Sequence, residues 1–361
     1  MSNIIMSNII MSNKTVVTVI GATGTQGGSV VAALLHDPTY TIRAVTRNID
    51  SDKARSLAAQ GVQVVSADLD DTESLRRAFA GSKAIFAVTN FFEALAVTSD
   101  SDEAMRIETR QARNLADAAA ATPGLEHYIW SSLPNASQNT RGQAPVSYMA
   151  SKNAGDAYIR EELPELWQRT TLVWFGWYAG NVRYPLYAPH KLLSFAGSPH
   201  DVVHYINVPG DTPQLVPLLG SETVNPGIWV RAILGQPQLT LPGKAVAAVA
   251  EYMSLGQVVA AQEQARAEAA AAAGCHGVAG VAGRSHIVEV SDAQYADMWP
   301  VWGAVLGSAH RYMAALPGRS FESVHGEIQV LQRGDLEMLE GLVSTKQAFD
   351  QMAAAAAAAG A

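Results

Sequence analysis

The stretch that decides the fold is VVTVIGATGTQGG, residues 16–28. A β-branched apolar run leads into three glycines, Gly21, Gly24 and Gly27. The run predicts a buried first strand. The glycines predict a tight turn whose backbone approaches a pyrophosphate and lets the next helix pack closely. Free N–H groups where a helix over 29–36 begins would bind the phosphates, so the stretch predicts a dinucleotide-binding turn, with a purely structural turn as the alternative.

Length and composition are typical of a globular protein with a large core. The chain has 361 residues, of which 48% are hydrophobic and 16% charged. This length suits one large domain or a nucleotide-binding domain with a smaller lobe. The net charge is −8 and no basic cluster is dense, which argues against binding to nucleic acid. The one cysteine, Cys275, excludes an intrachain disulfide and a cysteine-based zinc site, and it favours the cytoplasm.

The two ends of the chain are of low complexity. Residues 1–13 read MSNII, MSNII, MSN, with neither the basic region of a signal peptide nor a run long enough to span a membrane. We expect this segment to be disordered. Alanine-rich tracts occupy 267–273 and 353–359, and we expect residues 346–361 to form a loose tail.

Strand and helix patterns alternate along the first half of the chain. Expected strands are 16–20, 40–46, 62–66, 84–88, 127–131 and 170–175. Expected helices are 29–36, 52–60, 72–80, 104–121 and 146–163. This alternation predicts an α/β Rossmann fold, a doubly wound parallel sheet that binds its ligand at the carboxyl ends of the strands.

After about residue 180 the alternation breaks, which predicts a smaller C-terminal lobe. We expect a dinucleotide-binding domain over 14–185, to which 205–250 returns with a helix at 227–234 and a strand at 245–250. The substrate-binding lobe then comprises 186–204 and 251–345, with a strand at 286–290 and a helix at 293–305. Such junctions favour apolar clefts, so we expect this lobe to overhang the ligand edge of the sheet.

The second strand ends without a carboxylate. A site selective for NAD places an acidic residue there to bind the ribose 2′-OH. This chain has Thr46, Arg47 and Asn48 instead. A guanidinium matches a 2′-phosphate in charge and shape, so Arg47 predicts NADP(H). Arg43 competes for the role from within the strand, and an ordinary exposed arginine is the alternative.

Polar residues also follow the next two strands. After the third strand, Asp68 would accept the adenine amino group while Leu69 covers the ring. After the fourth, Thr89 and Asn90 would approach the riboses and phosphates. Each is also an ordinary turn residue, and the signal is their recurrence after successive strands.

A serine, tyrosine and lysine set predicts carbonyl reduction. Ser131 and Ser132 end the fifth strand, and Tyr148 and Lys152 lie four residues apart on one helical face. A phenol can protonate a carbonyl oxygen, an ammonium can lower the phenol's pKa and hold the ribose, and either serine hydroxyl can orient the substrate. The alternative is that the pair lies on the helix surface or only contacts the cofactor.

Two further groups of residues, three histidines and an aromatic cluster, are weaker indications of a functional site. His190, His200 and His204 lack metal-ligand spacing and a carboxylate companion, so no metal site is expected. Aromatic residues cluster after the sixth strand and indicate either packing or an apolar wall for a flat, aromatic or polyketide-like substrate: Trp174, Phe175, Trp177, Tyr178, Tyr184 and Tyr187.

Together these residues resemble the short-chain dehydrogenase/reductase superfamily, in particular its atypical NmrA-like branch. From residue 16 to about 302 the matching blocks are GATGTQGGSV, AVTRN, ADLDD, VTNFFE, YIWSSLPN and WYAGN. The resemblance implies NADP contacts from Gly21, Thr23, Gly24, Thr25, Gln26, Gly27, Gly28, Arg47, Asn48, Asp68, Leu69, Thr89, Asn90, Lys152, Tyr178 and Asn181. The resemblance also implies a basic residue after the fourth strand, and its position would fall near Arg110.

The chain departs from that branch in one respect. Its regulators and redox sensors generally lack the catalytic tyrosine, whereas Tyr148 and Lys152 are both present here. We therefore expect an NADPH-dependent reductase of a ketone, quinone or enone in a hydrophobic small molecule of secondary metabolism. A sensor that binds a partner protein according to NADP(H) status, and a scaffold that does neither, are the alternatives. A homodimer is left open.

Overall fold

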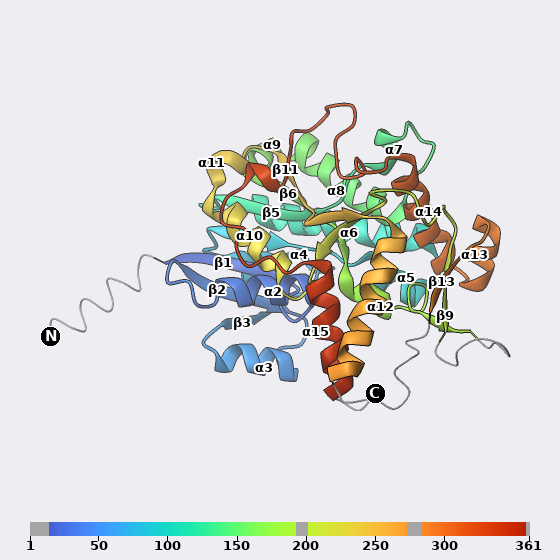
Figure 1. The fold of residues 1–361 in the computed structure, drawn as a ribbon. Coiled ribbons are helices and arrows are strands. Elements are labelled where there is room, and N and C mark those ends of the chain that lie inside the picture. The colour runs from blue at the N-terminus through green and yellow to red at the C-terminus, as the bar shows by residue number, and fades with distance from the viewer. Residues whose placement is uncertain (1–13, 193–200, 273–283, 359–361) are drawn as a thin grey trace.

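An eight-stranded parallel sheet forms the centre of the protein in the computed structural model, which describes residues 14–192, 201–272 and 284–358 (Figure 1). The strands run in the order β14-β11-β6-β5-β4-β1-β2-β3. Their bounds are β1 Thr15–Ile20, β2 Tyr40–Thr46, β3 Gln63–Ser66, β4 Ala84–Ala87, β5 His127–Ser132, β6 Thr170–Phe175, β11 Lys244–Ala248 and β14 Val330–Leu331. The order reverses between β1 and β4, and sheets of this kind bind ligands at such a point.

Helices cover both faces of this sheet because its strands are apolar on both sides. One face packs against α2 (Thr25–Leu34), α3 (Asp52–Ala59) and α10 (Asn225–Gly235), with Val30, Leu34 and Trp229 in the core. The other packs against α4 (Thr72–Phe79), α6 (Ser101–Ala120) and α8 (Ser147–Glu162). Short helices join these elements: α5 Phe91–Thr98, α7 Ala136–Asn139, α9 Pro164–Trp167 and α11 Pro237–Thr240.

A second lobe lies beside the sheet, at the right of Figure 1. It contains one sheet of β7 (Trp177–Tyr178), β10 (Val216–Gly220) and β12 (Glu251–Met253), and another of β8 (His190–Lys191), β9 (Val202–Ile206) and β13 (Ser285–Glu289). Its helices are α12 Leu255–Ala272, α13 Asp292–Met298, α14 Trp302–Ala315 and α15 Thr345–Ala358, and its 3₁₀ turn is η1 Ala179–Arg183. A further 3₁₀ turn, η2 Arg333–Asp335, follows β14 of the main sheet.

The predicted doubly wound fold is confirmed, while the lobe boundaries differ from those expected. β9 and β10 belong to small sheets of the lobe, so the return to the main sheet begins at α10 and not at residue 205. β14 pairs with β11, so the segment expected in the lobe also reaches the main sheet. The helix expected over 293–305 is two helices, because Pro300 disfavours helical backbone at Trp299 and Val301 has φ 68°.

The expected loose tail is wrong for residues 346–358. These residues belong to α15, which packs beside α12 (Figure 1). Thr345, Ala348 and Phe349 are buried, which is the spacing of an amphipathic face. Ser344 and Gln347 start the helix by exchanging hydrogen bonds between side chains and backbone N–H groups, a capping box readable in the sequence. The disorder expected over 1–13 lies outside the described residues.

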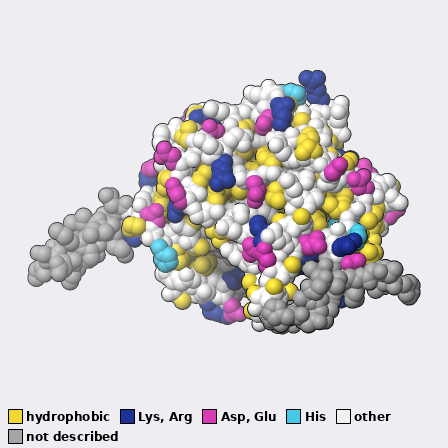
Figure 2. All heavy atoms as spheres, in the orientation of Figure 1, with side chains coloured by type: hydrophobic (Ala, Val, Ile, Leu, Met, Phe, Trp, Pro, Cys, Tyr) yellow, Lys and Arg dark blue, Asp and Glu magenta, His cyan; other side chains and the backbone are white. Residues whose placement is uncertain are grey.

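Charges of both signs are interspersed on the face that Figure 2 shows, without a continuous basic surface. Among the helices that the structure describes, none combines the length and the apolar run needed to span a bilayer.

Candidate functional site

The glycine turn lies where β1 runs into α2. Gly21 has φ 63°, a conformation that favours glycine. A Cβ on Gly27 would lie 2.3 Å from the Gly21 carbonyl oxygen, so only glycine lets α2 pack this closely. Gly24 precedes α2 without a side-chain cap, which leaves the first N–H groups of the helix available to an anion. The turn has the geometry expected of a phosphate site.

Two cations follow β2 in the sequence, Arg47 directly after the strand and Lys53 in the first turn of α3. The Arg47 side chain is 66% exposed and its guanidinium lies 2.5 Å from a Glu93 carboxylate oxygen. The Lys53 ammonium donates to the Thr23 carbonyl oxygen at 3.2 Å. Sequence reasoning missed Lys53, whose signal was a basic residue in the first turn of the helix after β2. Arg43, the competing candidate, instead donates to Gln63 and to two backbone carbonyls of the α4 end.

The loops after β3 and β4 border the same edge. Asp68 accepts from the Asp70 backbone N–H and is exposed, while Leu69 packs partly buried on the core. Asn90 is exposed at the start of α5, with Thr89 buried beside it. Arg110 does not point to a free site: it donates to Asp70 at 2.9 Å and so ties α6 to the β3 loop.

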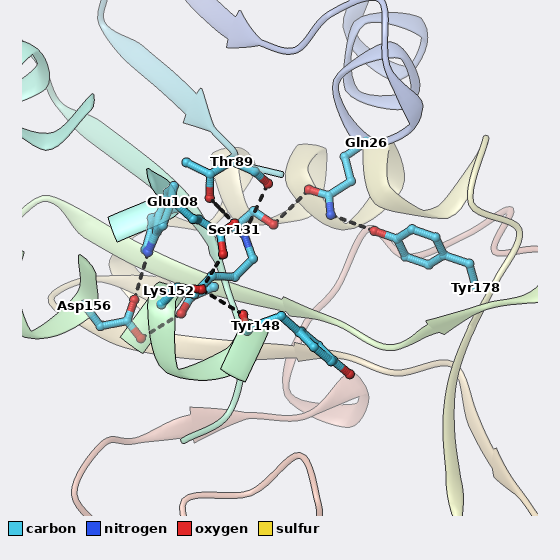
Figure 3. A network of polar contacts seen from close by, with 11 residues as sticks. Gln26, Thr89, Glu108, Ser131, Tyr148, Lys152, Asp156 and Tyr178 are labelled. Atoms are coloured by element: carbon cyan, nitrogen blue, oxygen red, sulfur yellow. Dashed lines mark hydrogen bonds and ion pairs between the residues drawn. The ribbon is translucent and has the colours of Figure 1, made fainter. Parts of the chain in front are cut away.

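Lys152 lies in a buried polar network that the sequence analysis did not foresee (Figure 3). Its ammonium lies 3.1 Å from Oε1 of Glu108, a carboxylate with no exposed surface, and 3.1 Å from the Thr89 hydroxyl. Glu108 also accepts from the hydroxyls of Thr89 and Ser151. The Lys152 charge is therefore neutralised inside the protein, and its position is set by β4 and α6.

The expectation that Lys152 lowers the pKa of Tyr148 is wrong. Burial, with smaller contributions from the Tyr187 and Tyr312 phenols, raises the pKa of Tyr148 well above its usual range. Figure 3 shows the Tyr148 ring directed away from Lys152. The ring packs against Phe92, with centroids 5.2 Å apart. Tyr148 donates no hydrogen bond within the described residues, so its hydrogen is available to a ligand.

The two serines of β5 point to opposite faces of the strand, as neighbouring strand residues do. The Ser132 hydroxyl donates to Asp156 at 2.7 Å, and burial raises the pKa of that carboxyl to about 6. The Ser131 hydroxyl donates to Gln26 Oε1 at 2.8 Å. Of the two alternatives, only Ser131 faces the glycine turn.

Gln26 links the glycine turn to the second lobe (Figure 3). While its Oε1 accepts from Ser131, its Nε2 donates to the Tyr178 phenol oxygen at 2.6 Å. The phenol's own hydrogen is thus left for another acceptor. Asn181 lies nearby in η1, whose Gly180 N–H donates to Glu222. The geometry joins residues from β1–α2, β5 and β7 at the carboxyl edge of the sheet.

Other predicted groups lie elsewhere. Trp174 and Phe175 are buried in the cores of the main sheet, and Tyr184 is 60% exposed. Trp177 and Tyr187 line a cavity of the second lobe. Within the described ranges, no three His, Cys, Asp or Glu side chains are grouped to hold a metal ion, and His200 falls outside those ranges.

Comparisons with known proteins identify the family of this chain and relatives that share its fold. A model of the NmrA-like family matches residues 13–272. An NmrA-like family domain-containing oxidoreductase of Aspergillus campestris is 29% identical over 267 residues, covering 71% of this chain and 74% of that relative. Another, of Aspergillus hancockii, is 32% identical over 169 residues, covering 46% of this chain and 47% of that relative.

Solved structures share the fold at low identity. A complex of NmrA, a negative transcriptional regulator, with NAD has a TM-score of 0.68 at 21% identity and covers 96% of this chain and 98% of that one. An NADPH-dependent quinone oxidoreductase from Escherichia coli, complexed with NADPH, has a TM-score of 0.61 at 19% identity, covering 93% and 99%. Both hold a nicotinamide dinucleotide on this type of sheet.

Proposed function

Because the chain belongs to the NmrA-like family, we propose that it is a reductase that transfers hydride from NADPH to a ketone, quinone or enone of a hydrophobic small molecule. The relatives named as oxidoreductases support the reaction class. Directly after β2, Arg47 and Asn48 stand where an NAD-selective site has an acidic residue, and Lys53 contacts the glycine turn, which supports a 2′-phosphate and hence NADP(H).

The observation that carries the proposal is the set of polar groups at the reversal of strand order between β1 and β4. The residues fit a dinucleotide: the start of α2 offers N–H groups to the phosphates, and Thr89 and Asn90 border the place where the ribose and nicotinamide would lie. The bound dinucleotide would supply the hydride. The chain's own residues would hold the substrate oxygen and return a proton to it.

We assign the proton to Tyr148. Its hydroxyl is not committed to a described acceptor, and its raised pKa keeps the phenol protonated until an oxyanion develops. Lys152 then acts by holding the Thr89 loop and the ribose, since its charge is paired with Glu108. Ser131 and Tyr178, linked through Gln26, would orient the carbonyl or the nicotinamide amide.

The test is NADPH consumption with a panel of aromatic ketones and quinones. Tyr148→Phe should lower kcat by roughly 100-fold with little change in NADPH affinity, because only the proton donor is removed. Tyr158→Phe is the matched control, since this phenol lies on the same helix and donates to Asp117. Full turnover in Tyr148→Phe would move the acid to another group such as Tyr178.

Absence of turnover across the panel, with tight NADPH binding, would contradict the reductase proposal. It would favour the sensor, whose affinity for a partner protein should then change with NADP(H) occupancy. The single cysteine is compatible with work in the reducing cytoplasm, which we propose as the compartment.

A further inference from the structure

A strained turn joins α13 and α14 of the second lobe. The Trp302 N–H donates to the Pro300 carbonyl oxygen at 2.8 Å across Val301, whose φ of 68° and ψ of −57° are those of a rare, strained type of γ-turn. A positive φ is an outlier for a β-branched residue and costs about 1–3 kcal/mol. Strained residues persist only where the surrounding structure holds them, and they cluster at functional sites. The contacts that Trp302 makes from the start of α14 therefore indicate what the turn is for.

Close packing holds this turn in place. The Gly303 N–H donates to the Trp299 carbonyl oxygen at 2.7 Å, and a Cβ on Gly303 would lie 2.4 Å from the Tyr295 carbonyl oxygen. Further along α14, Val305 is 5% exposed and packs in an apolar cluster that α5, α6 and α14 form together. The start of α14 is thus fixed against α13 and against α5, so the direction in which the Trp302 side chain leaves the helix is fixed as well.

The Trp302 ring belongs to a row of three aromatic rings that includes Tyr148, the proton donor of the proposed function. Trp302 stacks on Phe92 of α5, with ring centroids 5.8 Å apart and an angle of 12° between the rings. The Phe92 centroid in turn lies 5.2 Å from that of Tyr148. Aromatic pairs of this kind contribute about 0.5–1.5 kcal/mol beyond the area that they bury. Because Tyr148 donates no hydrogen bond within the described residues, the packing of its ring directs its hydroxyl.

This aromatic row reaches the ligand edge of the main sheet through α5. The helix begins directly after Asn90, which borders the proposed place of the nicotinamide, and Phe92 is its second residue. Leu95 of the same helix is fully buried in the cluster that contains Val305 of α14. Phe92 therefore lies between the dinucleotide edge and the second lobe, and Trp302 is the second-lobe residue that stacks on it.

We propose that Trp302 is a positioning residue: through Phe92 it holds the Tyr148 ring in the direction in which the hydroxyl reaches the substrate oxygen. The inference rests on the proposed reductase for the task of Tyr148, whereas the packing itself needs no turnover. A proton donor has to lie within hydrogen-bond distance of the oxygen that it protonates, and a displacement of about 1 Å can lower a rate by up to ~100-fold. The contribution of Trp302 should therefore appear in kcat and in the surroundings of the Tyr148 ring, and not in the affinity for NADPH.

The experiment labels the full chain with fluorotyrosine and identifies the fluorine NMR signal of Tyr148 by its loss in Tyr148→Phe. Trp302→Leu should shift this signal and lower kcat for phenanthrenequinone roughly tenfold, with the affinity for NADPH unchanged. Trp302→Phe keeps a flat ring on Phe92 and should largely restore both the signal position and kcat. Trp299→Leu is the matched control, because the Trp299 centroid lies 4.8 Å from that of Tyr295 within the second lobe, and its loss should leave both readouts unchanged.

A second pair of variants tests the turn without changing the aromatic rings. Val301→Gly can adopt a positive φ freely and should leave the Tyr148 signal in place. Val301→Pro, whose φ is fixed at about −65°, cannot form the turn and should shift the signal as Trp302→Leu does. Thermal denaturation shows whether each variant is folded, and Trp302→Leu decides the matter if Val301→Pro is not.

The outcomes separate this proposal from the proposed function. An unmoved Tyr148 signal in Trp302→Leu, or an unchanged kcat in that variant while Tyr148→Phe is slow, would overturn the positioning role. A shifted signal together with full turnover in Tyr148→Phe would contradict Tyr148 as the acid and leave the packing of its ring on Phe92 and Trp302 standing. If phenanthrenequinone is not reduced at all, the NMR signal alone decides whether Trp302 positions Tyr148.

Discussion

The proposed preference for NADPH depends on two single side chains, Arg47 directly after β2 and Lys53 in α3. Arg47 is exposed and paired with Glu93, and the Lys53 ammonium donates to the Thr23 carbonyl oxygen of the glycine turn. An exposed ion pair contributes little free energy, about 0.2–1 kcal/mol, so a 2′-phosphate can displace Glu93 from the guanidinium. In the proposed NADPH complex, Arg47 would then make a bidentate contact with the 2′-phosphate, a group that NADH lacks.

Arg47→Ala should reduce the preference for NADPH over NADH. We expect the unmodified protein to bind NADPH at least tenfold more tightly, or about 1.4 kcal/mol, and the variant to lose most of this difference, with Lys53 carrying the remainder. Fluorescence titration with NADPH and with NADH measures this difference in affinity. Arg76→Ala, an exposed arginine paired with Glu73, is the control. Equal affinities for NADPH and NADH before mutation would contradict the assignment.

Glu93→Gln should have the opposite effect. Removing the carboxylate frees Arg47 before the cofactor arrives, so affinity for NADPH should rise two- to fivefold, the range of an exposed ion pair, with no change for NADH. A parallel rise for both cofactors would show that Glu93 acts on another part of the dinucleotide.

At the scale of elements, contacts between neighbouring segments hold the site in shape. The turn between β1 and α2 depends on close backbone approach, and α15 depends on its packing against α12. The first arises from residues adjacent in sequence. The second joins segments about 90 residues apart, which no local pattern specifies.

Gly24→Val should abolish dinucleotide binding while the protein stays folded. A Cβ at this position would lie 3.2 Å from the Gly21 carbonyl oxygen, and the larger side chain would occupy the space that a pyrophosphate needs. The measurement is thermal stabilisation by NADP. Gly334→Val is the control, because a Cβ there meets nothing within 4 Å. Undiminished stabilisation in Gly24→Val would move the phosphate site away from this turn.

Phe349→Ala should destabilise the second lobe. The Phe349 ring is 2% exposed within the lobe core, and deleting such a ring typically costs 3–5 kcal/mol. Chemical denaturation measures the change, and Gln351→Ala on the exposed side of α15 should have no effect. A Phe349→Ala variant as stable as the parent would show that α15 does not stabilise the lobe.

For the whole molecule, buried ionisable groups make stability depend on pH. Burial lowers the pKa values of His127, His204 and His310 to about 4. The unfolded chain, with a histidine pKa near 6.5, therefore binds more protons between about pH 6.5 and 4. Stability is complete above this window and falls as pH drops through it. Asp156, whose pKa is raised to about 6, acts in the opposite direction.

His127→Gln should reduce this loss of stability in acid. The His127 ring is 5% exposed and bonds to Thr171, so its protonation in the folded state costs up to about 3 kcal/mol. The melting temperature of the variant should fall less than that of the parent between pH 7 and 4.5. His36→Gln, at an exposed position, should follow the parent. Identical pH profiles for His127→Gln and the parent would contradict the buried-histidine account.

The sequence by itself determined the parallel sheet, its ligand edge and the glycine turn, because these depend on periodicity and on backbone freedom within a few residues. Thr23, Arg47, Asp68 and Thr89 could be placed at that edge because each follows a strand. Only the tertiary structure decided how side chains are paired. Glu108 neutralises Lys152 from 44 positions away, Gln26 meets Tyr178 across 152 positions, and Tyr148 turns from Lys152 toward Phe92. Such pairs form only when the helices pack on the sheet. They are therefore stabilised by contacts between segments that are far apart in the sequence.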